Sequence, residues 1–268
     1  MGSQWPGGKN GGMSHVRFDV DEGICTITMD RPEVRNAVDG PMAAELHEAF
    51  LRFGEDDTLA VAVLTGAGGT FCAGADLSAV GDPERRNQLD PDGLGSGPMG
   101  PSRMEIGKPV IAAVSGHAVA GGLELALLAD LRVVEEDAIF GVFCRRWGVP
   151  LIDGGTVRLP RIVGQGRALD MILTGRPVGA HEALQMGLAN RVVPVGESLA
   201  VAHHIAEQIA AFPAECMKVD RASAYRQWDL PLDAALRSEG ANGVPMVRSE
   251  GADGAQRFAD GEGRHGTF

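Results

Sequence analysis

Hydrophobic and polar positions near the start of the chain follow a strand pattern and then a helical one. Residues 16–20 and 24–29 are rich in β-branched side chains and flank a turn that ends in Gly23, which predicts a β-hairpin. Further along, Asp39 precedes apolar residues that recur at helical spacing until Gly54. We therefore expect a helix capped by Asp39 to follow the hairpin.

Two continuous apolar runs, at residues 59–64 and 109–114, are typical of strands buried on both faces of a sheet. Residues 90–102 lie between them and are rich in Gly and Pro, which favours a mobile loop inside one domain. Residues 120–131 are apolar on every side of a helix, which predicts a buried helix. The rest of the pattern predicts a strand at 131–134 and helices at 164–173, 181–186, 199–211, 214–228 and 252–258.

Composition places the chain among ordinary globular proteins. Apolar residues make up 44% and charged residues 22% of its 268 residues, which excludes disorder as the main state and favours one large core. We interpret the Gly-rich residues 1–12 as a disordered or non-native tail, residues 13–195 as the core, and residues 196–268 as a helical C-terminal region.

The charge balance and the cysteines limit which partners and which cellular compartment we expect. With 24 Lys and Arg against 36 Asp and Glu, the net charge of −12 disfavours nucleic acid and anionic membranes as partners. The four cysteines form no pair motif and no signal peptide is recognisable, so we expect a cytoplasmic protein with free thiols. The apolar tract 109–134 carries Glu124, Asp130 and Arg132, so we assign it to the core and not to a membrane.

Common nucleotide and nucleophile motifs are incomplete. Phe71 stands where a dinucleotide fingerprint that starts at Gly66 needs its third glycine. The pair that ends in Lys108 lacks both the upstream glycine and the following Ser or Thr of a P-loop, and Ser115 lacks the glycine of a nucleophile elbow. These three classes of site are disfavoured.

One carboxylate stands out, because Glu124 lies in the apolar segment 118–129 with no cation before Arg132. Burial would raise its pKa toward neutrality and let it shuttle a proton, whereas a hydrogen bond to a core backbone group is the structural alternative. Gly121 and Gly122 precede it at the expected helix N-terminus, where free N–H groups can stabilise negative charge.

A second glycine-rich turn, at residues 68–77, follows the first buried strand and can supply another N–H group. Two such donors aimed at one carbonyl oxygen would form an oxyanion hole, in which losing one donor costs roughly 3–4 kcal/mol of barrier. The alternative is that these glycines only close tight turns.

Three segments carry a resemblance to a known family. They are residues 27–37 (ITMDRPEVRNA), residues 64–77, which end in FCAGADL, and residues 108–130, which begin KPVIAAVSGHAVAGGLELA. Together they resemble the enoyl-CoA hydratase/isomerase family, the crotonases. The resemblance implies an α/β fold of the crotonase-like (ClpP/crotonase) type, a spiral of ββα units with a C-terminal helical trimerisation region, assembled as a homotrimer or dimer of trimers.

The resemblance also assigns roles. It implies that the N–H groups of Ala75 and Gly121 form the oxyanion hole for an acyl-CoA thioester and that Glu124 is a catalytic residue. It implies no metal and no redox cofactor, since CoA is part of the substrate. The residues it places along the substrate are Arg35, Ala37, Ala75, Asp76, Leu77, Ser78 and Gly121.

Two departures from the family bear on the reaction. Cys144 takes the position of the second glutamate of hydratases, and beside Arg145 and Arg146 we expect its thiolate to be favoured, although we give the side chain a packing role. Asp153 resembles an active-site aspartate of the dienoyl-CoA isomerases, and a helix N-cap ahead of Gly154 is its alternative role.

These residues predict an enzyme of fatty acid and acyl-CoA metabolism. The first expectation is a lyase that hydrates a 2-enoyl-CoA, with Glu124 as base and Asp153 assisting. Isomerisation of a 3-enoyl- or dienoyl-CoA is the second, because one carboxylate can remove and return a proton at different carbons. A non-catalytic acyl-CoA-binding protein is the third.

Overall fold

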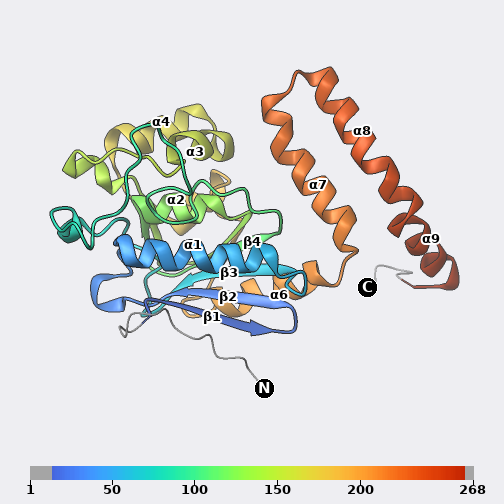
Figure 1. The fold of residues 1–268 in the computed structure, drawn as a ribbon, viewed down its shortest axis with the longest axis horizontal. Helices are drawn as coiled ribbons and strands as arrows, with labels where there is room; N and C mark the ends of the chain where they lie inside the picture. Colours follow the sequence, from blue (N-terminus) through green and yellow to red (C-terminus); the bar gives the residue numbers. More distant parts are fainter. Residues whose placement is uncertain (1–13, 263–268) are drawn as a thin grey trace. The chain divides into compact units, whose positions relative to one another are not determined.

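The computed structural model describes residues 14–262, so the tail expected at residues 1–12 lies outside the described residues. The chain divides into two units, one up to Glu207 and one from Gln208 (Figure 1). The first unit contains the sheets and the candidate site, and the described residues of the second form helices and no strand.

The first unit begins with the hairpin and helix that the sequence predicts. Strands β1 (Val16–Asp21) and β2 (Ile24–Met29) pair antiparallel, and helix α1 (Gly40–Glu55) follows. The Asp39 carboxylate accepts a hydrogen bond of 3.2 Å from the Met42 N–H and so caps α1 as expected. Hairpin, helix and cap are all confirmed.

The large sheet has the order β1-β2-β3-β4-β6-β9, and every pairing after the hairpin is parallel. The two apolar runs become its centre as β3 (Val61–Gly66) and β4 (Val110–Val114), which are buried almost throughout because elements cover both faces. Strand β6 (Leu131–Glu135) is also confirmed, whereas β9 (Arg191–Val193) was not predicted.

A small second sheet has the order β5-β7-β8, with β5 at His117–Val119, β7 at Ile139–Gly141 and β8 at Val178–Gly179. The chain alternates between the sheets, since β4 of the large sheet leads to β5 of the small one and then to helix α2 (Gly121–Leu128). It then repeats this path through β6, β7 and helix α3 (Gly155–Val163). Each turn of this spiral therefore ends by starting a helix beside the small sheet.

The helices that follow agree with the pattern except near the end of the chain. Helix α8 (Leu232–Arg248) was not predicted, and α3 was implied only by the alternative N-cap role of Asp153. Helix α8 continues through Gly240, Gly243 and Pro245, which the pattern treats as helix breakers. The later helices are α4 (Gln165–Thr174), α5 (Ala180–Gln185), α6 (Ser198–Ala210), α7 (Ala214–Arg226), α8 (Leu232–Arg248) and α9 (Glu250–Asp260).

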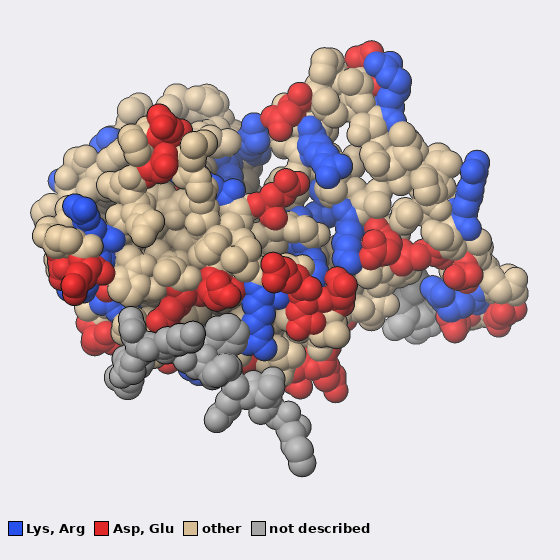
Figure 2. All heavy atoms as spheres, viewed as in Figure 1, with Lys and Arg blue, Asp and Glu red and all other residues tan. Residues whose placement is uncertain are grey.

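The apolar core lies between α1, the two sheets and α2. Every residue of α2 is buried, as the apolar pattern of this segment predicts. Among residues 14–262, no helix is long and apolar enough to cross a membrane. On the face shown in Figure 2, Lys and Arg side chains are interspersed with Asp and Glu side chains.

Candidate active site

Ala75 and Gly121 follow two backbone segments that pair in parallel. Cys72 pairs with Ala118 in a parallel bridge, with the Cys72 N–H donating to the His117 carbonyl at 2.9 Å. Ala75 and Gly121 each follow their bridge partner by three residues, so we expect the two residues to lie near one another. Within residues 14–262 neither N–H group donates to another group of the chain. Both amides are thus available to a ligand.

Glycines allow these segments to lie this close together. A Cβ atom on Gly122 would lie 2.1 Å from the Cys72 carbonyl oxygen, and one on Gly74 would lie 3.0 Å from the Gly121 nitrogen. Gly74 also has a φ of +99°, which side chains rarely adopt. The contact therefore requires glycine at both positions.

The turn into α2 is strained at a residue that is not glycine. Ala120 has φ 53° and ψ −125°, and its N–H donates to the Gly141 carbonyl of the small sheet at 2.9 Å. This conformation directs the chain from β5 into α2, so that the first N–H groups of α2 stay free of intrahelical partners. The positive end of the helix dipole lies at the same place.

Glu124 lies one helical turn after Gly121 and is only 2% exposed. Its Oε1 atom accepts hydrogen bonds of 2.8 Å from the N–H groups of Asp153 and Gly155. A Cβ atom on Gly155 would lie 2.9 Å from that oxygen, so only glycine leaves room for it. Oε2 has no bond to any described residue, which leaves one carboxyl oxygen for a substrate.

Burial raises the pKa of Glu124 to about 7, and the nearby charge of Asp153 adds to the effect. The hydrogen bonds from Gly155 and Asp153 act in the opposite direction, because they stabilise the carboxylate. Both interpretations of this residue thus hold in part, since it bonds core backbone groups and also has a near-neutral pKa. A carboxyl group with this pKa can take up and release a proton at neutral pH.

Asp153 lies next to Glu124 and is 4% exposed. Its Oδ1 atom accepts a hydrogen bond of 2.9 Å from the Met99 N–H and a short one from the Ser102 hydroxyl. Burial raises its pKa. The N-cap role considered for it is wrong, because Gly154 is the N-cap of α3 and the Asp153 side chain turns instead to residues 99–102.

Comparisons with known proteins identify the family of the chain. Residues 19–262 match the sequence model of the enoyl-CoA hydratase/isomerase family. The chain belongs to this family. The enoyl-CoA hydratase EchA19 of Mycobacterium tuberculosis is 36% identical over 87% of this chain and 89% of its own length. A carnitinyl-CoA dehydratase of Escherichia coli K12 is 42% identical over 69% of this chain and 70% of its own.

Solved structures show that the chain has the crotonase fold of this family. An enoyl-CoA hydratase from M. tuberculosis H37Rv superposes with a TM-score of 0.86 at 33% identity, over 92% of this chain and 96% of that one. A hydratase from Mycobacterium marinum gives a TM-score of 0.86 at 32% identity over the same shares. The predicted α/β spiral is therefore confirmed.

Cys144, where hydratases of the family are expected to carry a second glutamate, is buried at 7% exposure. Burial and the charge of Glu124 raise the pKa of its thiol, so the expectation of a favoured thiolate is wrong. The neighbouring arginines point elsewhere, since Arg145 donates to the Ile172 carbonyl and Arg146 lies over the Phe143 ring. Its packing role agrees with its place in the apolar core.

The residues that the family resemblance places along the substrate lie on neighbouring segments. Ala73, just before the Ala75 turn, donates its N–H to the Arg35 carbonyl, and Val38 pairs with Ala75. The predicted substrate residues Arg35, Ala37, Ala75, Asp76, Leu77 and Ser78 are thereby brought close to the free Ala75 amide.

The Asp76 side chain is occupied within the protein. Its Oδ2 atom pairs with Arg31 at 3.2 Å and with Arg85 at 2.9 Å, while Oδ1 accepts from the Ser78 hydroxyl at 2.6 Å. Asp39 pairs with the same two arginines, and the balanced cluster holds the Val38 and Ala75 segments together. A ligand could therefore meet the backbone of Asp76 but not its carboxylate.

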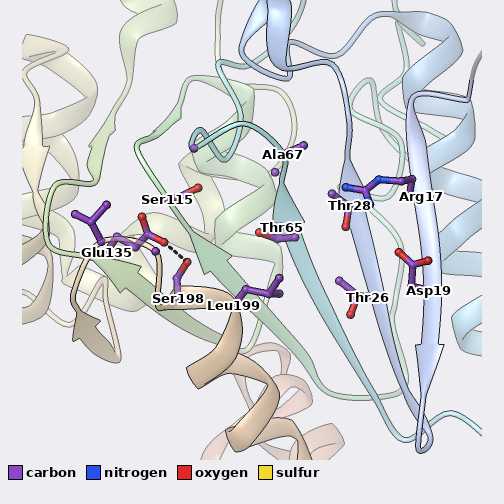
Figure 3. Close-up of a pocket in the computed structure, with 14 residues that line it drawn as sticks. Arg17, Asp19, Thr26, Thr28, Thr65, Ala67, Ser115, Glu135, Ser198 and Leu199 are labelled. Carbon is purple, nitrogen blue, oxygen red and sulfur yellow. Dashed lines mark hydrogen bonds between the residues drawn. The ribbon is translucent and has the colours of Figure 1, made fainter.

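A hollow of about 510 Å³ lies elsewhere, between the large sheet and the start of α6 (Figure 3). Hydroxyl groups of Thr26, Thr28 and Thr65 line it, and the Ser198 hydroxyl donates to Glu135 at 2.7 Å. None of the predicted site residues lines this hollow. The hollow is therefore separate from the candidate active site formed by Ala75, Gly121 and Glu124.

Met99 and Ser102 are the residues of this site that the sequence did not reveal. Both are buried, yet they lie in the segment that reads as a mobile Gly- and Pro-rich loop. That segment forms neither helix nor strand, and its second half is held in place by the bonds to Asp153. The only signal that could have found them is a Met and a Ser in an otherwise featureless loop.

Proposed function

We propose that the chain hydrates a 2-enoyl-CoA thioester, with the Ala75 and Gly121 amides as oxyanion hole and Glu124 as the group that moves the proton. The observation that carries the proposal is a buried carboxyl group of pKa about 7 one helical turn from an unoccupied amide at a helix N-terminus. The hydratase and dehydratase names of the relatives support it, because dehydration is the reverse of hydration.

The proposed reaction balances with one carboxyl group. Ionised Glu124 takes a proton from water, the water oxygen bonds to C3, and the π electrons of the C2=C3 bond move into an enolate held by the two amides. The protonated Glu124 then returns the proton to C2, and the thioester carbonyl reforms. Asp153 assists Glu124 by donating its N–H group to the Glu124 carboxylate. No metal or redox group takes part in these steps.

Isomerisation is a second candidate, because a specific residue favours it. Cys144 leaves Glu124 without the second glutamate expected of hydratases. A single carboxyl group suits an enzyme that removes a proton from one carbon of a 3-enoyl-CoA and returns it to another.

One assay separates these functions. We expect purified protein to bleach the enoyl-thioester absorbance of crotonyl-CoA, whereas an isomerase would create that absorbance from a 3-enoyl-CoA. We expect Glu124→Gln to lower kcat by about a thousandfold or more, because the amide cannot take a proton, while the Kd for the thioester changes little. Binding without turnover in the wild type would identify an acyl-CoA-binding protein, and wild-type rates in the variant would exclude Glu124 as the proton carrier.

We also propose assembly into a homotrimer or a dimer of trimers through α7, α8 and α9. In the described chain no residue of these helices is buried, and α8 exposes the apolar side chains of Leu232, Leu236 and Val247. Buried reduced thiols at Cys25, Cys72 and Cys144 support a cytoplasmic location.

A further inference from the structure

Asp153 connects the candidate active site to residues 97–102, and the contacts on the two sides differ. On one side, its own N–H group donates to Glu124. On the other, its Oδ1 atom receives the Met99 N–H and the Ser102 hydroxyl. One residue thus holds the catalytic glutamate with its backbone and the 97–102 segment with its side chain.

The segment is a tight turn built around the Asp153 carboxylate. Gly97 has a φ of +102° and Gly100 a φ of +94°, and the Gly100 N–H donates to the Gly97 carbonyl at 3.0 Å. A Cβ atom on Gly100 would lie 2.4 Å from the Ala43 carbonyl oxygen of α1, so the turn rests on that helix. Ser102 is fully buried, and its hydroxyl is directed to Asp153.

The turn places a thioether against the oxyanion hole. Met99 is 1% exposed, and a Cβ atom on Gly121 would lie 2.7 Å from its Sδ atom and 2.9 Å from its Cε atom. The Met99 side chain therefore fills the space beside Gly121 where another residue would have its own side chain. It covers the Cα side of Gly121, one bond from the amide nitrogen, so we expect it to limit the access of water to the N–H. In a drier site the N–H stabilises a developing oxyanion more strongly.

We propose that Asp153 is a positioning residue that fastens the 97–102 turn so that Met99 seals the Gly121 amide. The proposal rests on the proposed function only for its kinetic readout. It differs from proton donation by Asp153, because the tether needs an acceptor oxygen at Oδ1 and not an acidic proton.

Substitutions at three residues separate tethering from proton donation. Asp153→Asn keeps an acceptor oxygen for both donors and loses the acid, whereas Asp153→Ala loses both. Ser102→Ala weakens the tether and keeps the acid, and Met99→Ala keeps tether and acid but removes the seal. Asp90→Asn is the matched control, because the Asp90 carboxylate also accepts loop N–H groups but is exposed and has no bond to residues of the site.

We expect kcat for crotonyl-CoA hydration to fall about tenfold in Asp153→Ala, Ser102→Ala and Met99→Ala with little change in KM, because the amide acts on the transition state. Asp153→Asn should recover most of the rate that Asp153→Ala loses. The double variant Asp153→Ala with Met99→Ala should be no slower than the slower single variant, since both act through one side chain. An Asp153→Asn enzyme as slow as Asp153→Ala, with Ser102→Ala at the wild-type rate, would overturn the proposal.

Hydrogen exchange tests the tether without any activity. Amide exchange over residues 96–104 and 119–125 should accelerate about tenfold or more in Asp153→Ala and Ser102→Ala, and stay close to wild type in Asp153→Asn and Asp90→Asn. Unchanged exchange in both Asp153→Ala and Ser102→Ala would refute the tether even in an active enzyme. If the wild type does not hydrate crotonyl-CoA, the proposed function fails while this readout still decides the tether. If Asp153→Ala does not fold, exchange in Ser102→Ala still decides the tether, and the rate of Met99→Ala still decides the seal.

Discussion

At the scale of single residues, the chemistry concentrates on Glu124. The sequence indicated this residue because a lone glutamate in an apolar helix has no local partner. It could not indicate that Asp153 and Gly155 donate their amides to it, because those bonds depend on how α3 begins in three dimensions. The sequence likewise showed that Cys144 replaces the second acid. The prediction of a favoured Cys144 thiolate was wrong, because burial raises the pKa of the thiol and the two neighbouring arginines point away.

The pKa of Glu124 predicts how the rate depends on pH. Because the base form is the carboxylate and its pKa is about 7, kcat/KM should rise about tenfold per pH unit below that value and level off above it. A profile of crotonyl-CoA hydration between pH 5 and pH 9, in buffers of equal ionic strength, measures this. A plateau that continued down to pH 5 would contradict a base with a raised pKa.

The same shift affects stability, with a definite sign. The pKa of Glu124 in the folded protein lies above its usual value of 4.5. The contribution of Glu124 to the free energy of unfolding is therefore fully present below pH 4.5 and is lost as pH rises through about 7. Glu124→Gln keeps an acceptor oxygen and has no charge to bury, so above pH 8 it should be more stable than the wild type by about 1–3 kcal/mol. Urea unfolding at pH 5 and pH 8 would show the gap opening only at the higher pH.

At the scale of elements, the long patterned segments were predictable and the short ones were not. The hairpin, α1, β3 and β4 follow from alternation, capping and apolar runs. Strands β5 and β7 have three residues each, too few to show a period, and α3 begins with glycine and contains Pro160. The elements that turn the chain into the site are thus the ones whose form is set by tertiary contacts.

The close contact between α2 and the Cys72 segment gives an element-scale prediction. Gly122→Ala would place a Cβ atom 2.1 Å from the Cys72 carbonyl oxygen, so the backbone that carries the Ala75 and Gly121 amides must move. We expect a loss of about 2 kcal/mol or more in unfolding free energy, together with a loss of activity if the two amides form the proposed oxyanion hole. Thermal unfolding and the crotonyl-CoA assay measure the two effects.

A matched control is available in α1. Gly54→Ala meets nothing within 4 Å, so it should leave activity unchanged and raise stability by up to about 1 kcal/mol through helix propensity. Equal behaviour of the two glycine variants would show that the α2 contact is not the constraint inferred here.

At the scale of the whole molecule, the second unit exposes several large apolar side chains. Helix α8 carries Leu232, Leu236 and Val247 on one face, at 77%, 59% and 70% exposure, and Phe258 of α9 is 64% exposed. The sequence did not predict this helix, because Gly240, Gly243 and Pro245 interrupt its helical period. A helix with such a face is stable when another surface covers it.

In the proposed trimer, neighbouring subunits would cover the apolar face of α8. Charged side chains placed on this face should therefore disrupt the trimer. Leu232→Asp combined with Leu236→Asp puts two carboxylates where the assembly would bury apolar side chains, so we expect trimers or hexamers to dissociate at micromolar concentration. Leu89→Asp is the control, since it changes a leucine of 68% exposure in the first unit. Sedimentation velocity reports the assembly directly. A double variant that still sediments as the wild-type oligomer would show that α8 is not the interface, and a wild type that sediments as a monomer would leave the exposed face to a partner other than this chain.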